Sequence, residues 1–152
     1  MKNIIRKIIN RYLYILNSLR INIIRLRGAK IEEGVKLYGP IFLSDNPKNL
    51  KIKKNTVLNS FVTISCRDKI SIGKNCHISS GVNIHTGYLN DDLSKHLSDP
   101  ISIGDNCWLA SNCTIAAGVT ISSNVKIGAN SFVNKDILSP GLYVGSPVRK
   151  ID

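Results

Sequence analysis

An aliphatic residue recurs at every sixth position from residue 31 onward, and this spacing constrains the fold more than any other feature of the sequence. A small or aliphatic residue follows most of these positions four residues later. A period of six fits neither the turn of an α-helix nor the simple alternation of a strand. It predicts an all-β protein of about five triangular coils, in which three six-residue segments close one coil and successive coils stack. The triplets that define the coils are Ile31, Leu37 and Leu43; Ile52, Leu58 and Ile64; Ile72, Ile78 and Ile84; Ile103, Leu109 and Ile115; and Ile121, Ile127 and Val133.

The spacing between triplets shows where the coils are interrupted. Ile84 and Ile103 lie nineteen positions apart, and the shorter insertions fall at the same corner of the triangle. We expect a functional loop over residues 85–100, because long loops on a rigid scaffold commonly carry binding and catalytic residues. The predicted organisation is a helix over residues 1–30, a repeat domain over 31–138 and a tail over 139–152.

The four cysteines are predicted to be reduced thiols. Cys76, Cys107 and Cys113 occupy the inward small-residue position of the repeat, which favours a stack of buried thiols over nucleophiles or metal ligands. Cys66 lies in an inserted corner, and we assign it no chemistry. The sequence shows no secretory leader and no C-x-x-C pair, so we expect a cytoplasmic protein without a metal site.

The first thirty residues carry eight of the 21 Lys and Arg residues, and no acid precedes Glu32. Their apolar spacing predicts a basic amphipathic helix that ends near Gly28. Its longest apolar run, Tyr12 to Leu16, is far too short to span a membrane. Two interpretations remain open: a cap on the end of the coil, or a helix lying on the anionic inner face of a membrane through residues 1–27. Nucleic-acid binding is not expected, because the interleaved aromatic and basic residues of single-strand binders are missing.

Five sequence fragments in the second half of the chain point to a known family: Ile103–Leu109 (IGDNCWL), Ala117–Ile121 (AGVTI), Ile127–Ser131 (IGANS), Val133–Asp136 (VNKD) and Val144–Arg149 (VGSPVR). With these fragments in order, residues 72–152 resemble the hexapeptide-repeat acyltransferases of the maltose, galactoside and polysaccharide O-acetyltransferase kind. The resemblance implies a left-handed parallel β-helix, a homotrimer, acetyl-CoA as the donor, and active sites in the clefts between neighbouring subunits.

The resemblance also implies a set of cofactor-binding residues in the last coils: Trp108, Ser111, Ala129, Asn134, Lys135 and Arg149. By the resemblance, Ser111 corresponds to the backbone position beside the thioester, and Ala129 to a contact with the pantetheine arm. Lys135 and Arg149 would supply positive charge for the coenzyme phosphates. On the acceptor side, Asn59 falls where galactoside-type members carry an Asn that contacts the sugar.

The general base is the point at which the sequence departs from the family. Transfer from a thioester to a hydroxyl needs a base that works near neutral pH, and histidine is the natural candidate. The family carries this histidine five residues after the aliphatic position that opens the long loop, and Leu89 stands there in this sequence. We therefore consider His85, at the start of the loop, and then His96, within the loop. His77 is expected to be a surface side chain.

The sequence thus predicts an acetyl-CoA-dependent O-acetyltransferase that acts on a sugar or on a precursor of a cell-surface polysaccharide. One alternative is a non-catalytic binding or scaffold member that has lost the base. Another is a metal-dependent lyase of the carbonic-anhydrase type, which needs three convergent histidines. The Trp108 and Lys135 motifs favour the acetyltransferase.

Overall fold

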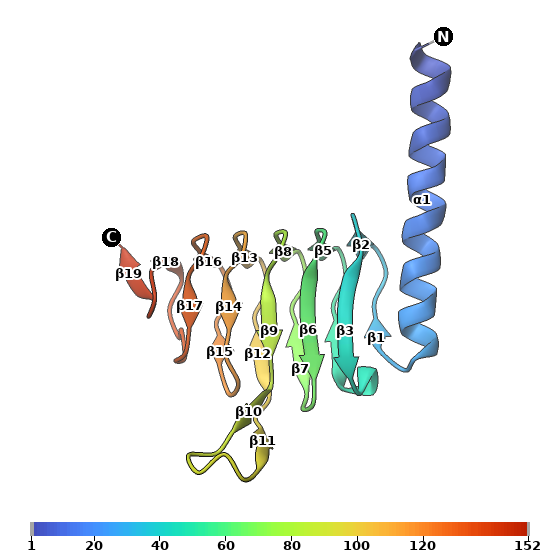
Figure 1. Ribbon diagram of the computed structural model, residues 1–152. Helices are drawn as coiled ribbons and strands as arrows, with labels where there is room; N and C mark the ends of the chain where they lie inside the picture. Colours follow the sequence, from blue (N-terminus) through green and yellow to red (C-terminus); the bar gives the residue numbers. More distant parts are fainter. Residues whose placement is uncertain (1, 152) are drawn as a thin grey trace.

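The protein is a parallel β-helix with one long helix at its N-terminal end, as the computed structural model shows (Figure 1). The structure describes the backbone of residues 2–151 and the surroundings of their side chains except at positions 2, 3 and 10. Residue 1 of the predicted helix lies outside the described residues. Five complete coils and part of a sixth follow the helix, which confirms the predicted fold class.

Each coil contributes one short strand to each of three faces. Face A consists of β1 (Lys30–Ile31), β4 (Leu50–Ile52), β7 (Ile70–Ile72), β12 (Ile101–Ile103) and β15 (Thr120–Ile121). Face B consists of β2 (Lys36–Leu37), β5 (Val57–Leu58), β8 (His77–Ile78), β13 (Trp108–Leu109), β16 (Val125–Ile127), β18 (Gly141–Val144) and β19 (Arg149–Ile151). Face C consists of β3 (Ile41–Asp45), β6 (Val62–Cys66), β9 (Asn83–His85), β14 (Thr114–Ile115) and β17 (Phe132–Val133). All neighbours pair in parallel except β18 and β19.

The core is the aliphatic ladder that the six-residue period predicts. On face A, for example, Ile52 pairs with Ile72, which pairs with Ile103 on the next coil. Fourteen of the fifteen triplet residues are buried. Leu43 is only half-buried, because β3 is the edge strand of face C and has a coil on one side only. Stacking of identical positions thus removes the apolar side chains from water without any large aromatic core residue.

Asparagines at positive φ turn the chain at the corners, as at Asn75, Asn106 and Asn124. This conformation is costly for most residues, and Asn adopts it more readily than the others except Gly. The Asn75 amide donates to the Asn106 side-chain oxygen at 3.2 Å, and Asn106 donates to Asn124 at 3.2 Å. These corner side chains therefore tie successive coils together.

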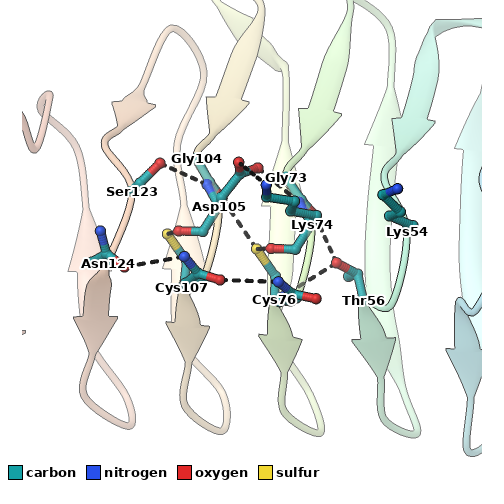
Figure 2. Close-up of polar contacts among 12 residues, drawn as sticks. Lys54, Thr56, Gly73, Lys74, Cys76, Gly104, Asp105, Cys107, Ser123 and Asn124 are labelled. Atoms are coloured by element: carbon teal, nitrogen blue, oxygen red, sulfur yellow. Dashed lines mark hydrogen bonds and ion pairs between the residues drawn. The ribbon is translucent and has the colours of Figure 1, made fainter.

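The inward corner position holds polar and thiol side chains in one stack, Thr56, Cys76 and Cys107 (Figure 2). The Cys76 thiol donates to the Gly104 carbonyl at 3.1 Å, and the Cys107 thiol donates to the Ser122 carbonyl at 3.2 Å. The four cysteines are free and buried, as expected for the three repeat positions.

The sequence left the role of Cys66 open, and the structure places its side chain in the core. Cys66 ends β6 in register with Asp45 and is fully buried, because face C strands continue inward for one more residue before they turn. Burial raises the pKa of the Cys66 thiol to about 12 and that of Cys113 to about 12. Both are therefore packing residues rather than nucleophiles.

Helix α1 (Lys2–Leu26) packs on β1 and β2 with its last turns, and its remaining length projects past the coil (Figure 1). Asn17 accepts a hydrogen bond from the Leu37 backbone N–H, and Arg25 donates to the Ile31 carbonyl at 2.7 Å. Ile21 and Ile24 are buried against the first coil. Only this end of the helix closes the coil.

Candidate active site

The predicted loop over residues 85–100 is an ordered β-hairpin. Strands β10 (Gly87–Leu89) and β11 (His96–Ser98) pair antiparallel and stand out from the corner between faces C and A (Figure 1). At its base, the Tyr88 hydroxyl donates to Asp99 at 2.8 Å. At its tip, Lys95 N–H donates to the Asn90 side chain at 2.9 Å. The insertion that the sequence predicted as a loop is therefore a paired β-hairpin, which we call the arm.

The register of the hairpin places His96 directly opposite Leu89. Side chains that lie opposite one another in an antiparallel pair point to the same face. His96 therefore presents its imidazole on the face of the arm to which Leu89 also contributes. Both side chains are exposed.

His85 lies at the root of the same arm, at the end of β9 and in register with Ser65. Its side chain is half-buried, and this burial lowers the pKa of its imidazole. A lowered pKa keeps the ring neutral at neutral pH, which is the form that can accept a proton.

Thr86 fixes the root of the arm and escaped the sequence analysis. This residue is fully buried, and its hydroxyl donates to the Ser65 carbonyl at 2.8 Å while it accepts from Asp68 N–H at 3.0 Å. The Asp99 N–H donates to the Thr86 carbonyl at 3.0 Å and closes the other side of the root. The only sequence signal is that Thr86 continues the alternation of inward residues after Ile84.

A polar cluster on face C adjoins His85 and was likewise missed. The Ser65 hydroxyl donates to Asp45 at 2.7 Å, and this hydrogen bond lowers the pKa of the Asp45 carboxyl. Arg67 lies 3.7 Å from the same carboxylate, and its side chain approaches Gly87 in the arm. The cluster comes from two corner segments that precede insertions, around Asp45 and around residues 65–67, so the six-residue period carries no information on it.

The predicted cofactor-binding residues lie on the C-terminal coils and are all exposed. Ser111 follows β13 and Ala129 follows β16 at the corner between faces B and C, where Asn130 N–H donates to the Ser111 carbonyl at 3.0 Å. Asn59 follows β5 at this corner in an earlier coil. Trp108 faces outward on face B between His77 and Lys126.

Asn134 and Lys135 lie at the opposite edge of face C. Val133, which precedes them, aligns through Ile115 with Ile84, so these residues share an edge with His85. Arg149 lies on β19, opposite Val144. One chain therefore places Ser111, Ala129 and Asn59 at one edge of face C and the histidine arm at the other.

Two cavities lie elsewhere on the molecule. One of about 610 Å³ lies between α1 and the first coil. The other, of about 460 Å³, lies on face A, where Lys30, Lys48, Lys51 and Lys69 line it, and Pro100 at the root of the arm is also part of its lining. Neither is lined by a predicted site residue.

The three histidines occupy face B, face C and the arm, so they do not converge within one chain. Among the described residues, no group of three or more His, Cys, Asp or Glu side chains is placed to hold a metal ion. No described helix is long and apolar enough to cross a membrane.

Residues 100–135 match the family model described as bacterial transferase hexapeptide (six repeats). A galactoside O-acetyltransferase of Escherichia coli (strain K12) is 34% identical over 137 residues, which cover 87% of this chain and 67% of that protein. This chain belongs to the hexapeptide-repeat acetyltransferases. The left-handed β-helix that the resemblance implied is the fold of this family.

Solved structures agree with this membership of the hexapeptide-repeat acetyltransferases. A galactoside acetyltransferase in complex with coenzyme A has a TM-score of 0.82 at 33% identity, over 88% of this chain and 68% of that one. A maltose O-acetyltransferase from Clostridium difficile 630 has a TM-score of 0.81 at 29% identity, over 93% of this chain and 84% of that one.

Some relatives in other parts of the family are much longer than this acetyltransferase. An N-succinyltransferase of tetrahydropyridine dicarboxylate from Methylorubrum extorquens (strain PA1) is 33% identical over 127 residues. The match covers 83% of this chain but only 37% of that protein, so it concerns the shared coil.

Proposed function

We propose that this acetyltransferase moves the acetyl group of acetyl-CoA to a hydroxyl group of a sugar. The observation that carries the proposal is the match to a galactoside O-acetyltransferase over 87% of the chain. Structural neighbours that bind coenzyme A or acetyl coenzyme A support the choice of donor. The acceptor class rests on the galactoside and maltose enzymes among the relatives.

In the proposed reaction, a neutral histidine of the arm takes the proton of the sugar hydroxyl as the oxygen attacks the thioester carbonyl. A backbone N–H near Ser111 donates to the oxyanion that forms. The carbon–sulfur bond then breaks, and the coenzyme thiolate leaves and regains a proton from the imidazolium. Lys135 and Arg149 hold the coenzyme phosphates, Trp108, Ala129 and Asn134 line the pantetheine path, and Asn59 contacts the sugar.

Two histidines are candidates for the base. His85 has the lowered pKa and the fixed root position that suit a base. His96 shares a face of the arm with Leu89, the position of the family's histidine. This chain carries Leu89 where the family carries its histidine. That difference favours the alternative function, a binding member without turnover.

The test measures coenzyme A release from acetyl-CoA with galactoside and maltose acceptors, using wild type, His85→Ala and His96→Ala. We expect a fall in kcat/KM of about 10²- to 10⁴-fold for one variant and little change for the other. Leu89→Ala is the matched control on the arm. Turnover like wild type in both histidine variants would remove the proposed mechanism, and coenzyme A binding without turnover by wild type would favour the scaffold alternative.

We also propose a homotrimer, because one chain leaves the two halves of the site at opposite edges of face C. In a trimer, the arm of one subunit would reach the Ser111 edge of its neighbour. A precursor of a cell-surface polysaccharide, handled at the inner face of the membrane, is the acceptor that the chain's features favour. The lysine-lined cavity on face A passes the root of the arm at Pro100 and suits an extended saccharide better than a free monosaccharide.

A further inference from the structure

Helix α1 presents two faces, and only one of them contacts the coil. Asn17, Ile21 and Ile24 recur at helical spacing on the coil-facing side. Ile21 and Ile24 are each 7% exposed, and Asn17 accepts from Leu37 N–H. This narrow face is enough to fix the direction of the helix on the first coil.

The second face is a continuous apolar row that we call the outer stripe: Ile4, Ile8, Tyr12, Ile15, Leu19 and Ile23. Its side chains are between 49% and 64% exposed. At about 100° of rotation per residue, the outer stripe and the coil-facing side are about 180° apart. The contrast is plainest where the helix is docked, because Leu19 and Ile23 are exposed while Ile21 between them is buried. The outer stripe therefore faces directly away from the protein.

Basic side chains border the outer stripe along both edges. Arg11 follows one edge. Arg20 lies between the other edge and the coil-facing side, where it also lines the cavity between α1 and the first coil. Residues 1–31 contain no acid. The two ion pairs among the described residues involve Arg67 and Lys74, so neither Arg11 nor Arg20 is neutralised within the chain. The same end of the protein holds most of the charge, because residues 1–54 carry a net +10 of the total of +11.

These charges decide which partner fits. A second copy of α1 would place Arg and Lys against Arg and Lys, with no carboxylate on either helix to compensate. A bilayer surface with anionic headgroups complements the basic borders and also accepts the apolar row. The helix is not apolar enough to cross such a bilayer.

We propose that α1 is an in-plane membrane anchor whose outer stripe lies in the surface of an anionic bilayer. Because the stripe faces away from the coil, the coils would stack outward from the membrane. The arm leaves the third coil, which places it about 20 Å above the bilayer surface, the sum of one helix diameter and two coil spacings. The inference does not depend on acetyl transfer, although this height suits an acceptor carried on a lipid.

The experiment is co-sedimentation of the full chain with vesicles. One set contains phosphatidylcholine alone, and the other contains phosphatidylcholine with about one third phosphatidylglycerol. We expect at least ten-fold tighter binding to the anionic vesicles, and a loss of this binding as the salt concentration rises from about 0.1 M to about 0.5 M.

Three paired substitutions test the two features separately. Ile8→Glu with Ile15→Glu breaks the outer stripe, and Arg11→Glu with Arg20→Glu reverses its borders. Phe42→Glu with Leu138→Glu is the matched control, since both side chains are exposed apolar residues of the coil. We expect the first two pairs to lower vesicle binding at least ten-fold and the control to leave it unchanged.

Two outcomes would overturn the anchor. One is an equal loss of binding in the control and the stripe variant. The other is failure of the wild type to bind anionic vesicles, together with a smaller sedimentation coefficient for the stripe variant, which would assign the stripe to a second copy. Circular dichroism of each variant checks its folding, and acetylation of a soluble sugar, measured in parallel, reports on the proposed function alone.

Discussion

At the scale of single residues, the Thr86 hydroxyl is the contact that holds the arm to the coil. Thr86→Val keeps the shape of the side chain but leaves the Asp68 N–H without its acceptor. We expect a loss of about 1–3 kcal/mol in the free energy of unfolding, measured with urea. The same variant should lower kcat/KM, because His85 is the preceding residue.

Thr120→Val is the control for this substitution, since Thr120 is exposed on β15. If both variants unfold at the same urea concentration as wild type, the Thr86 hydroxyl does not hold the root of the arm.

His85 also links stability to pH. Burial lowers the pKa of its imidazole in the folded protein, so the unfolded chain binds the proton more tightly. The stabilisation is therefore present above the ordinary histidine pKa of about 6.5 and is lost as the pH falls through the lowered folded value. His85→Gln should lessen the fall in the urea midpoint between about pH 7.5 and pH 5.5. His96→Gln is the matched control. If the urea midpoint of His85→Gln falls between these pH values as much as that of wild type, the assignment to His85 is contradicted.

At the scale of the corner elements, the stacked corner asparagines stabilise the coil through both their backbone conformation and their side-chain hydrogen bonds. Asn106 has φ of 57° and bonds to Asn75 and Asn124 on the adjacent coils. Asn106→Ala should cost about 1–2 kcal/mol in unfolding free energy, because Ala lacks the polar side chain that lets Asn adopt positive φ and also loses both hydrogen bonds. Asn106→Gly removes the same hydrogen bonds but accepts the turn, and should cost less. Equal losses in urea unfolding would show that the backbone conformation contributes nothing.

The coil was predictable from the sequence because each inward position repeats at a fixed spacing and its burial follows from stacking. The arm was predictable only as an interruption. Its two strands have three residues each, too few for an alternation to be read, and their register was unknown. That register decides which residue lies opposite Leu89, so the sequence could name His96 but could not place it.

The remaining differences have the same origin. The role of Cys66 stayed open because β6 runs longer than the period requires, and the insertion hid this extra inward residue. Asp45, Ser65 and Arg67 were missed because long-range pairing brings their segments together. Local pattern thus determines the repeat, whereas contacts between insertions determine the candidate site.

At the scale of the whole molecule, the proposed site is composite, and subunit mixing can test this. One inactive variant lacks the base through His85→Ala with His96→Ala. The other lacks coenzyme binding through Ser111→Glu with Ala129→Glu, which place carboxylates at the opposite edge of face C. The two chains are co-expressed with different tags, and trimers that carry both tags are isolated. A mixed trimer contains two chains of one variant and one of the other. In either composition, one site in three combines an intact arm with an intact donor surface on the neighbouring subunit.

Mixed trimers should therefore recover about one third of wild-type activity, although each parent is inactive. This recovery requires that the arm of one subunit act on coenzyme bound to the next. If both halves of the site came from one chain, every site in a mixed trimer would carry a defect. Activity no higher than that of the parents would then place the whole site on one chain, and the separation of Ser111 and His85 across face C would need another explanation.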